Sequence, residues 1–284
     1  MPYPISRRSA MLGGLAVAAS AGGLYAAATT TDTASTALAG TVPTRDPAGP
    51  PRAVGAQAFV QRWAPNPAVD KLAAFVGVED DRSHSHPGVQ HIFADPDQYR
   101  FVMHVKDRDG SDRQRQEVRG MQSGGTRVDM HKNETWRYNY QMYIPDTLKG
   151  TTNFTHIFQV KHNGVGSPVV TISLGRSGSN ERIEMRMYGS GGATIGSTDL
   201  AKLRNMWIDI EIEIKVADGS KNGSLRFQIQ DAGTTVVNAS HAGDTWLGGN
   251  EAHPKWGIYR SIKDSGQLHD TYLLTRNMKA FKNE

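Results

Sequence analysis

The 284-residue sequence predicts an all-β protein, a jelly-roll sandwich made of two antiparallel sheets. From Gln98 onward, apolar and polar residues alternate with a period of two, which is the pattern of half-buried strands. Helical patterns are scarce, and no regular alternation of strand and helix segments indicates a parallel sheet. Many short strands separated by Gly and Asn turns favour two sheets packed face to face.

The expected strands share this alternation and, in chain order, cover residues 99–106, 113–121, 136–144, 155–162, 169–174, 182–188, 207–216, 224–230, 234–238, 255–259 and 271–281. A turn at 107–110 follows the first of them, and Pro145 ends the third. Short helical turns are expected at 68–75 and 199–203.

The N-terminal residues predict an export signal. Arg7 and Arg8 precede an uncharged stretch rich in Ala and Gly, which is typical of a twin-arginine signal peptide over residues 1–39. Its glycines make it too weakly apolar for a membrane anchor. Residues 40–52 have the composition of a flexible linker, and 53–284 form the expected jelly-roll domain. We therefore expect a secreted protein with no membrane association after signal removal.

Composition limits the possible partners. The chain has no Cys, so packing rather than disulfides must hold the fold, and its formal net charge of +4 is compatible with an anionic ligand without requiring one. No phosphate loop, dinucleotide fingerprint or nucleic-acid motif is present. We expect a monomer without a cofactor and without a nucleic-acid partner.

The first segment that carries chemistry is RQRQEVR, residues 113–119. Arg113, Arg115, Glu117 and Arg119 share one face of a strand, because side chains alternate along it. Three guanidinium groups on one face would repel each other without anions, and their planar donors bind carboxylates. This face is predicted to bind an anion.

The second segment is HIFQVKH, residues 156–162. Strict alternation places Gln159 and Lys161 on one face, where they offer amide and ammonium donors. The same alternation places His156, Phe158 and His162 on the opposite face.

The third segment is KWGIYRS, residues 255–261. Lys255, Gly257, Tyr259 and Ser261 share a face, and Gly257 is expected to leave the surface beside Tyr259 open to a ligand.

Together these groups supply the parts for β-elimination on a uronic acid unit of an acidic polysaccharide. That reaction removes the proton on C5 and expels the oxygen on C4. Arg and Gln donors stabilise the charge that develops on the neighbouring carboxylate. A Tyr or His within reach takes the proton, and Tyr can return one to the leaving oxygen.

The three segments also resemble the motifs of a known enzyme family. RQEVR (115–119) resembles the R-[ST]-E-[LV]-R signature of the alginate lyases of polysaccharide lyase family seven. QVK (159–161) resembles their Q-[IV]-H, and KWGIY (255–259) resembles their K-A-G-x-Y, in the same order. The wider pattern, which includes the 136–144 strand, is closer to the glucuronan lyases and heparin-lyase-like enzymes that share the jelly roll. The resemblance covers about residue 99 to the C-terminus.

The resemblance implies roles for individual residues. Arg115 or Arg119, together with Gln159, would neutralise the substrate carboxylate, and Tyr259 would be the catalytic Tyr. We expect Lys161, Lys255 and Arg113 to contact substrate.

The position of the family's catalytic His is open. Lys161 stands at that position, Gln116 replaces Ser or Thr, and Ser261 replaces a frequent Gln. His162 could supply the function if a bulge turns it inward, and His131 could reach the substrate from the segment before 136. Further candidates in the loop ahead of the core are His84, His86 and His91.

Two other functions compete with the lyase hypothesis. In WIDIEIEIKV (207–216), Asp209, Glu211 and Glu213 lie opposite a row of Ile, so they form either a solvated outer face or the carboxylates of a retaining glycoside hydrolase. A non-catalytic carbohydrate-binding module on the same fold would not need Tyr259.

The aspartates of DRDGSD (107–112) give a weak calcium-loop pattern at Asp107, Asp109 and Asp112. A hairpin turn explains them equally well, so no metal site is predicted.

Overall fold

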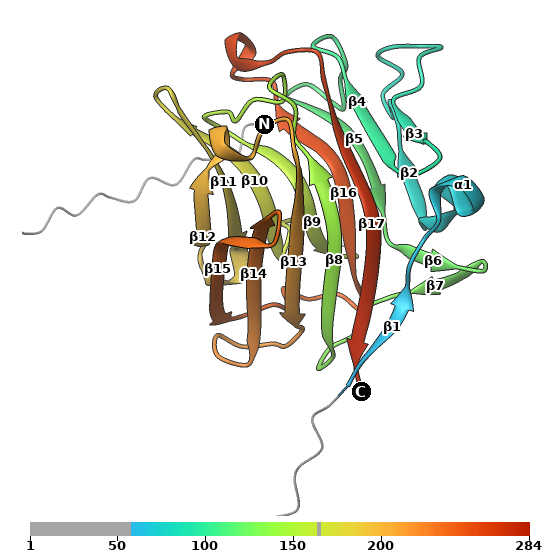
Figure 1. Cartoon of the computed structure of the whole chain (residues 1–284), viewed down its shortest axis with the longest axis vertical. Helices are drawn as coiled ribbons and strands as arrows, with labels where there is room; N and C mark the ends of the chain where they lie inside the picture. Colours follow the sequence, from blue (N-terminus) through green and yellow to red (C-terminus); the bar gives the residue numbers. More distant parts are fainter. Residues whose placement is uncertain (1–57, 164–165) are drawn as a thin grey trace, which may run out of the picture. The chain divides into compact units, whose positions relative to one another are not determined.

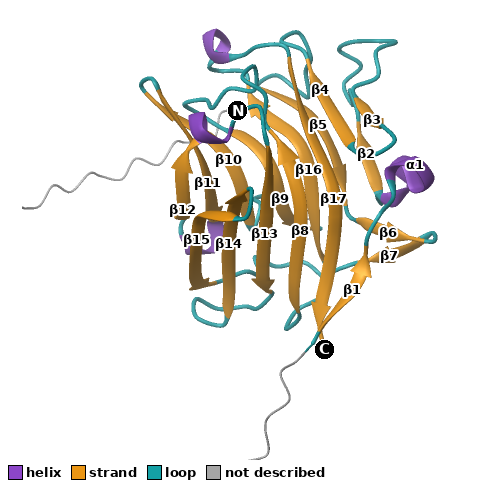
Figure 2. Cartoon of the chain, viewed as in Figure 1, coloured by secondary structure: helices purple, strands orange, loops and turns teal. Residues whose placement is uncertain are grey.

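The computed structural model describes residues 58–163 and 166–284. The expected signal peptide (1–39) and linker (40–52) lie outside the described residues. Figure 2 shows that strands dominate the described part of the chain and that its helices are short. Among the described residues, no helix combines the length and apolarity needed to cross a membrane.

One sheet has eight strands, hydrogen-bonded in the order β15-β14-β13-β8-β17-β4-β3, with β1 paired to β17. Their bounds, in that order, are Thr234–Gly243 (β15), Gly223–Asp231 (β14), Trp207–Lys215 (β13), Thr135–Tyr143 (β8), Thr271–Asn283 (β17), Tyr99–Met103 (β4), Ile92–Ala94 (β3) and Phe59–Trp63 (β1). This sheet lies in front in Figure 1.

The second sheet has seven strands in the order β12-β11-β10-β9-β16-β5-β2. Their bounds are Ala193–Asp199 (β12), Asn180–Met187 (β11), Val170–Ser177 (β10), Thr155–His162 (β9), Ala252–Ser261 (β16), Arg113–Arg119 (β5) and Gly77–Glu79 (β2). Strand pairing is antiparallel in both sheets, which confirms the predicted all-β sandwich.

The remaining elements are short. Strands β6 (Met121–Ser123) and β7 (Thr126–Val128) form a separate two-stranded hairpin. The helical elements are α1 (Pro67–Asp70) and the 3-10 turns η1 (Lys71–Ala74), η2 (Tyr188–Ser190), η3 (Leu200–Leu203) and η4 (Ser265–Gln267). The helical turns expected at 68–75 and 199–203 coincide with α1–η1 and η3.

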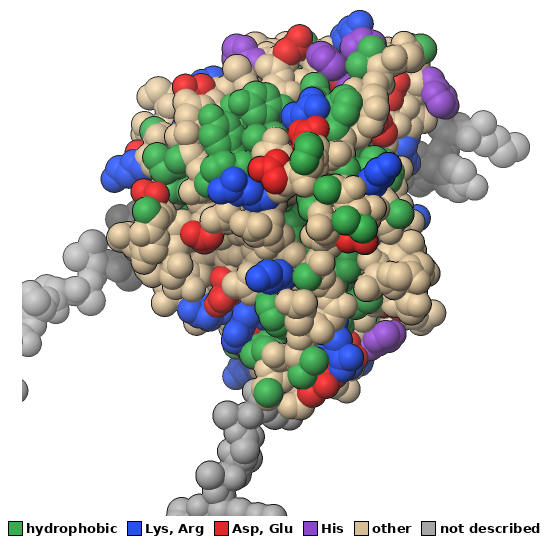
Figure 3. All heavy atoms as spheres, turned by 45° about the vertical axis from the view of Figure 1, so that its right-hand side comes forward, with side chains coloured by type: hydrophobic (Ala, Val, Ile, Leu, Met, Phe, Trp, Pro, Cys, Tyr) green, Lys and Arg blue, Asp and Glu red, His purple; other side chains and the backbone are tan. Residues whose placement is uncertain are grey.

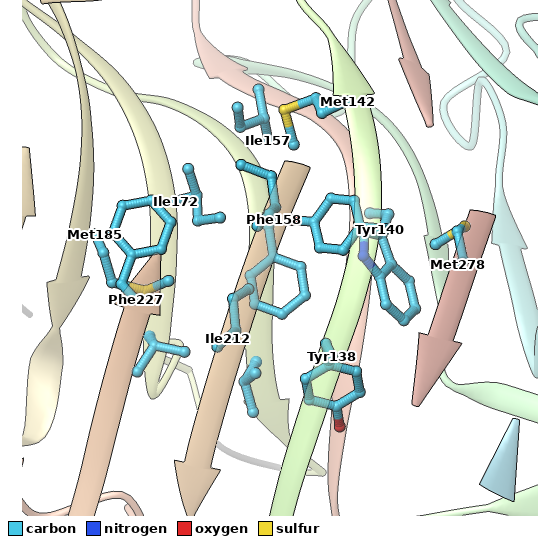
Figure 4. Close-up of a cluster of buried hydrophobic side chains, with 14 of the residues drawn as sticks. Tyr138, Tyr140, Met142, Ile157, Phe158, Ile172, Met185, Ile212, Phe227 and Met278 are labelled. Carbon is cyan, nitrogen blue, oxygen red and sulfur yellow. The ribbon is translucent and has the colours of Figure 1, made fainter. Parts of the chain in front are cut away.

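The core lies between the two sheets, where each sheet buries its apolar face. Figure 4 shows Tyr138 and Tyr140 of β8 and Ile212 of β13 close to Phe158 of β9. Phe158 and Trp256 of β16 are at most 1% exposed, and their rings lie 5.7 Å apart. Burying such large side chains supplies most of the driving force for packing the sheets. The polar residues that alternate with them are therefore directed to the outer faces.

Strand prediction succeeded where the alternation is long. The strand expected at 155–162 matches β9, and the one expected at 207–216 exceeds β13 by one residue. The three-residue strands β2, β3, β6 and β7 were not predicted, and neither were β1 and β12, because short or weakly apolar segments carry little period-two signal.

Candidate active site

Strands β5, β16 and β9 are neighbours in the seven-stranded sheet, and they bring the three motifs together. Tyr259 lies opposite Arg115, while Lys255 lies between Arg119 on β5 and Gln159 on β9. These five side chains therefore share the outer face of this sheet, turned away from the core.

Glu117 is the centre of a buried ionic network on this face. Its side chain is 0% exposed, and it accepts hydrogen bonds from Arg115 Nη1 at 2.6 Å and Gln159 Nε2 at 2.6 Å. Lys255 Nζ lies 2.8 Å from Glu117 Oε2. A buried carboxylate needs such partners, because its desolvation is costly. One of the two side-chain N–H groups of Gln159 is thus used in a hydrogen bond within the protein.

Glu79 of β2 closes the network from the edge of the sheet. Its Oε2 accepts a hydrogen bond from Lys255 Nζ at 2.8 Å and lies 3.3 Å from Arg115 Nη1. Burial alone would raise the pKa of Glu79, but Lys255, Arg115 and Arg82 outweigh burial and hold it below its usual value. Lys255 is therefore held between two carboxylates, a position that suits bracing the site better than contacting substrate.

Tyr259 is surrounded by cations. Arg113 Nη1 donates a 2.8 Å hydrogen bond to its hydroxyl, and the Arg115 guanidinium lies 3.9 Å from the centre of its ring. Arg115 is fixed in turn by Asp109, whose Oδ2 is 2.8 Å from its Nε. Asp109, Glu117 and Glu79 overcome the opposing effect of burial and raise the pKa of Arg115. One guanidinium group therefore lies at the Tyr259 hydroxyl and another lies over its ring.

Gly257 has a backbone conformation and a close backbone contact that a residue with a side chain would not tolerate. Its φ is +131°, and a Cβ at this position would lie 2.2 Å from the Gln116 carbonyl oxygen. The pairing register between β16 and β9 shifts just here, between Trp256 and Tyr259. Gly257 therefore permits the close approach of β5 and the register shift against β9, a different role from the open surface expected for it, while Tyr259 keeps the face that alternation from Lys255 gives it.

The predicted face of His156 is wrong. A register shift in β9 turns His156 onto the same face as Gln159, where its Nδ1 lies 2.8 Å from Ser173 Oγ. Its ring centre is 5.8 Å from that of Tyr259. Burial, helped by Arg186 and Arg115, lowers the pKa of His156 to about 3. It is therefore a neutral imidazole beside the phenol at neutral pH.

His253 is a second histidine on this face that the sequence analysis did not single out. It lies opposite Lys161 in the β16–β9 register and is 7% exposed. Burial, followed by the nearby cations Arg119 and Lys255, lowers its pKa to about 4. Alternation back from Lys255 would have found it, but the expected strand began at 255, after Pro254.

The free donors line a shallow groove over this network. A hollow of about 310 Å³ is bounded by Arg119, Lys161, Arg82 and His253 among others, and a second of about 460 Å³ runs along Arg113. The Arg119 side chain is 42% exposed, and its Nε is 3.8 Å from Glu79. Lys161 Nζ donates to the Gly166 carbonyl at 2.9 Å, and burial, then Lys255 and Arg115, lower the pKa of Lys161. These donors are available to an anionic ligand.

The other candidate histidines lie apart from Tyr259. His162 keeps the core-facing side of β9, with its ring edge-on to Trp246 at 4.2 Å, so no bulge turns it toward Tyr259, although it borders the hollow of about 310 Å³. His131 is exposed, and its Nδ1 lies 3.7 Å from Glu134. Neither ring takes part in the network around Glu117.

The acid row lies on the outer face of the other sheet. Ile210 and Ile212 of β13 are buried in the core, so Asp209, Glu211 and Glu213 point outward. Each acid accepts hydrogen bonds from a neighbouring side chain. Asp209 accepts one from Gln141, and Glu213 accepts one from Arg137. Glu211 accepts from both Asn139 and Arg226. A hollow of about 230 Å³ lies over these strands, and the Asp209 and Glu211 carboxylates that line it accept hydrogen bonds from neighbouring side chains.

The chain was compared with known proteins. No protein-family model matches it, and no curated protein matches its sequence. Among solved structures, an endo-β-1,4-glucuronan lyase from the fungus Trichoderma reesei superposes with a TM-score of 0.52 at 11% identity, over 78% of this chain and 95% of that chain. An alginate lyase from Pseudomonas aeruginosa gives 0.48 at 13% identity, over 75% and 100%. An alginate lyase from polysaccharide lyase family 7 gives 0.43 at 16%, over 71% and 86%. At 11% identity, the similarity to the glucuronan lyase shows the jelly-roll fold alone.

Proposed function

We propose that this chain is a polysaccharide lyase that cleaves a uronate-containing polysaccharide by β-elimination. The observation that carries the proposal is Tyr259, whose hydroxyl accepts from Arg113 and whose ring lies under the Arg115 guanidinium. A structural Tyr on a sheet surface does not need two guanidinium groups or a buried carboxylate to hold them in place. An acid–base Tyr needs both.

The groove suggests a division of labour among the donors. Arg119 and Lys161 have free donor groups, so they bind the carboxylate next to the reacting carbon. One side-chain N–H of Gln159 donates to Glu117, and this hydrogen bond fixes the direction of the other N–H. Lys255 and Glu117 hold the site without contacting substrate. This assignment moves Lys255 from substrate contact to support.

The chemical step is a proton transfer coupled to bond cleavage. In this step Tyr259 starts as the phenolate and takes the C5 proton, the C–H electron pair forms the C4=C5 double bond, and the C4–O bond breaks. The phenol then returns the proton to the departing oxygen. Arg119, Lys161 and Gln159 stabilise the charge that spreads onto the carboxylate during this step.

Glucuronan is the first substrate to test, because the structurally similar fungal enzyme is a glucuronan lyase. Secretion by the twin-arginine route remains part of the proposal and rests on Arg7, Arg8 and the residues after them. Appearance of a shortened chain outside the cell, lost when both Arg are replaced by Lys, would test it.

The deciding experiment offers the purified chain glucuronan, alginate, heparin-type glycans and pectate. The lyase proposal predicts growing ultraviolet absorbance from the new double bond, and products whose masses show no added water. Products with one added water per cleavage would indicate a glycoside hydrolase instead. Binding without cleavage of any polymer would indicate a carbohydrate-binding module.

A further inference from the structure

Three histidines and one aspartate converge at one end of the sandwich, outside the network around Glu117. The four are His86, His91, His104 and Asp107, and one ligand atom from each lies within 4.8 Å of all the others. In Figure 1 the loops after β2 and β4, which carry these residues, lie together at the upper right. Figure 3 shows several exposed His side chains along the top of the molecule, whereas His91 and Asp107 of the cluster are buried below the surface. We propose that this cluster is a Zn²⁺ site that ties the two sheets together.

The distances from Asp107 are compatible with a four-coordinate ion. Asp107 Oδ1 lies 2.9 Å from His86 Nδ1, and Asp107 Oδ2 lies 3.3 Å from His91 Nε2 and 3.4 Å from His104 Nδ1. Ligands about 2.0–2.1 Å from a tetrahedral zinc stand roughly 3.3 Å apart. Three imidazoles and one carboxylate are also donors that Zn²⁺ accepts, whereas Ca²⁺ and Mg²⁺ prefer oxygen.

The hydrogen bonds leave two ring nitrogens facing the centre without a partner. His91 is 0% exposed, and its Nδ1 lies 2.7 Å from Asp80 Oδ1, so Nδ1 carries the proton in the neutral ring. The lone pair on its Nε2 then faces the lone pairs of Asp107. His91 Nε2 and His104 Nδ1 are both buried without a hydrogen-bond partner. A cation between these atoms converts the repulsion into coordination.

Asp80 provides the outer support that metal-binding histidines usually have. A carboxylate that accepts from the far nitrogen of His91 fixes its tautomer and orientation. Asp80 is itself fixed, because its Oδ2 accepts from the backbone N–H groups of His91 and Ile92 at 3.0 and 3.1 Å.

Because the ligands come from segments of both sheets, the ion has a structural role. His91 and His104 flank β3 and β4 of the eight-stranded sheet, while His86 follows β2 and Asp107 precedes β5 of the seven-stranded sheet. Four protein ligands leave no open position for a reacting water. The ion therefore acts as a cross-link in a chain that has no Cys.

The same cross-link supports the groove. Asp107 lies two residues before Asp109. The Oδ2 of Asp109 accepts a 2.8 Å hydrogen bond from Nε of Arg115 and thereby fixes that side chain. Gln114 of β5 donates to the carbonyl oxygens of His104 and Asp107 at 2.9 and 2.8 Å. The sequence pattern at 107–112 suggested a turn or a calcium loop, and only Asp107 of its three aspartates belongs to the cluster.

The test measures zinc binding by the full chain after chelator treatment and dialysis. We expect one equivalent of Zn²⁺ by mass spectrometry, and a melting temperature about 5–10 °C higher when free Zn²⁺ is about 100 times its Kd. Co²⁺ added in place of Zn²⁺ should give the visible bands of a four-coordinate site, a readout that needs no mutation. Stabilisation by Ca²⁺ or Mg²⁺ equal to that by Zn²⁺, or no bound metal, would overturn the proposal.

Matched variants locate the ion. His86→Gln removes a partly exposed ligand and should abolish the Zn²⁺-dependent rise, while His84→Gln, an exposed His in the same loop, should keep it. Asp80→Asn keeps all four ligands and should weaken Zn²⁺ binding about 10- to 100-fold. Equal loss of binding in His84→Gln and His86→Gln would mean that zinc binds elsewhere, which refutes the site.

Discussion

The two outer faces of the sandwich both carry rows of charged residues, yet they differ in how those charges are held. On the eight-stranded sheet, Glu211 and Glu213 remain partly exposed, and each pairs with a neighbour at the surface. On the seven-stranded sheet, Glu117 is fully buried beneath Arg115 and Lys255. Exposed pairs add little stability, whereas a buried network requires costly desolvation. Only the outer face of the seven-stranded sheet therefore carries a buried charge network, an arrangement that stability of the fold does not require.

This difference separates the lyase from the glycoside hydrolase hypothesis. A row of acids on a strand is equally compatible with a solvated face and with catalysis. The contacts of the acids distinguish these alternatives, and they favour the face that contains Tyr259.

The largest expected effect is that of Tyr259→Phe. Only the hydroxyl is removed, so the ring still packs against Phe154 and under Arg115. Loss of a positioned acid–base group should lower kcat about 100- to 10,000-fold with little change in KM. Steady-state rates on the active polymer, with circular dichroism as the folding control, measure this. Unchanged turnover in the Phe variant would transfer the role to His253 or His156.

Glu117→Ala tests the buried network. It leaves Lys255 and Arg115 without their shared buried carboxylate, so we expect the free energy of unfolding to fall by about 3–5 kcal/mol. The matched change on the other face, Glu213→Ala, removes an exposed partner of Arg137 and should cost at most about 1 kcal/mol. Urea unfolding of both variants makes the comparison. Equal losses would show that the two faces do not differ as described.

His253→Gln tests the electrostatics of the groove through pH. The pKa of His253 is about 4 in the folded chain but near 6.5 when unfolded, so the unfolded chain binds more protons between these values. The stability linked to this group is complete above pH 6.5 and is lost as pH falls toward 4, by an amount on the order of 3 kcal/mol. Unfolding measured across this range should show a shallower loss in His253→Gln than in the wild type. Exposed His131→Gln is the control and should follow the wild type.

The smallest expected effect is that of Glu211→Gln on the acid row. Its carboxylate lies on the face opposite the groove, so activity should stay within about twofold of the wild type. Complete loss of turnover in a folded Glu211→Gln protein would revive the hydrolase hypothesis.

The sequence predicted the sandwich and the shared face of its three motifs because both depend on alternation. Side chains two residues apart lie on the same side of a strand whatever surrounds them. Arg115, Arg119 and Tyr259 could therefore be assigned to faces without a structure. The same rule failed for His156, where one extra residue in β9 reverses the parity. Two consecutive apolar residues, Ile157 and Phe158, were the only local sign of that bulge.

Contacts between distant strands were decided by tertiary structure alone. Sequence spacing cannot show that Lys255 is neutralised by Glu79, 176 residues away, or that Glu117 collects three donors. The cluster of His86, His91, His104 and Asp107 likewise exists only because the loops of two sheets meet at one end. Alternation acts along one strand and is written in the sequence. Strand register and loop packing depend on the whole core, so they emerge only when the chain has folded.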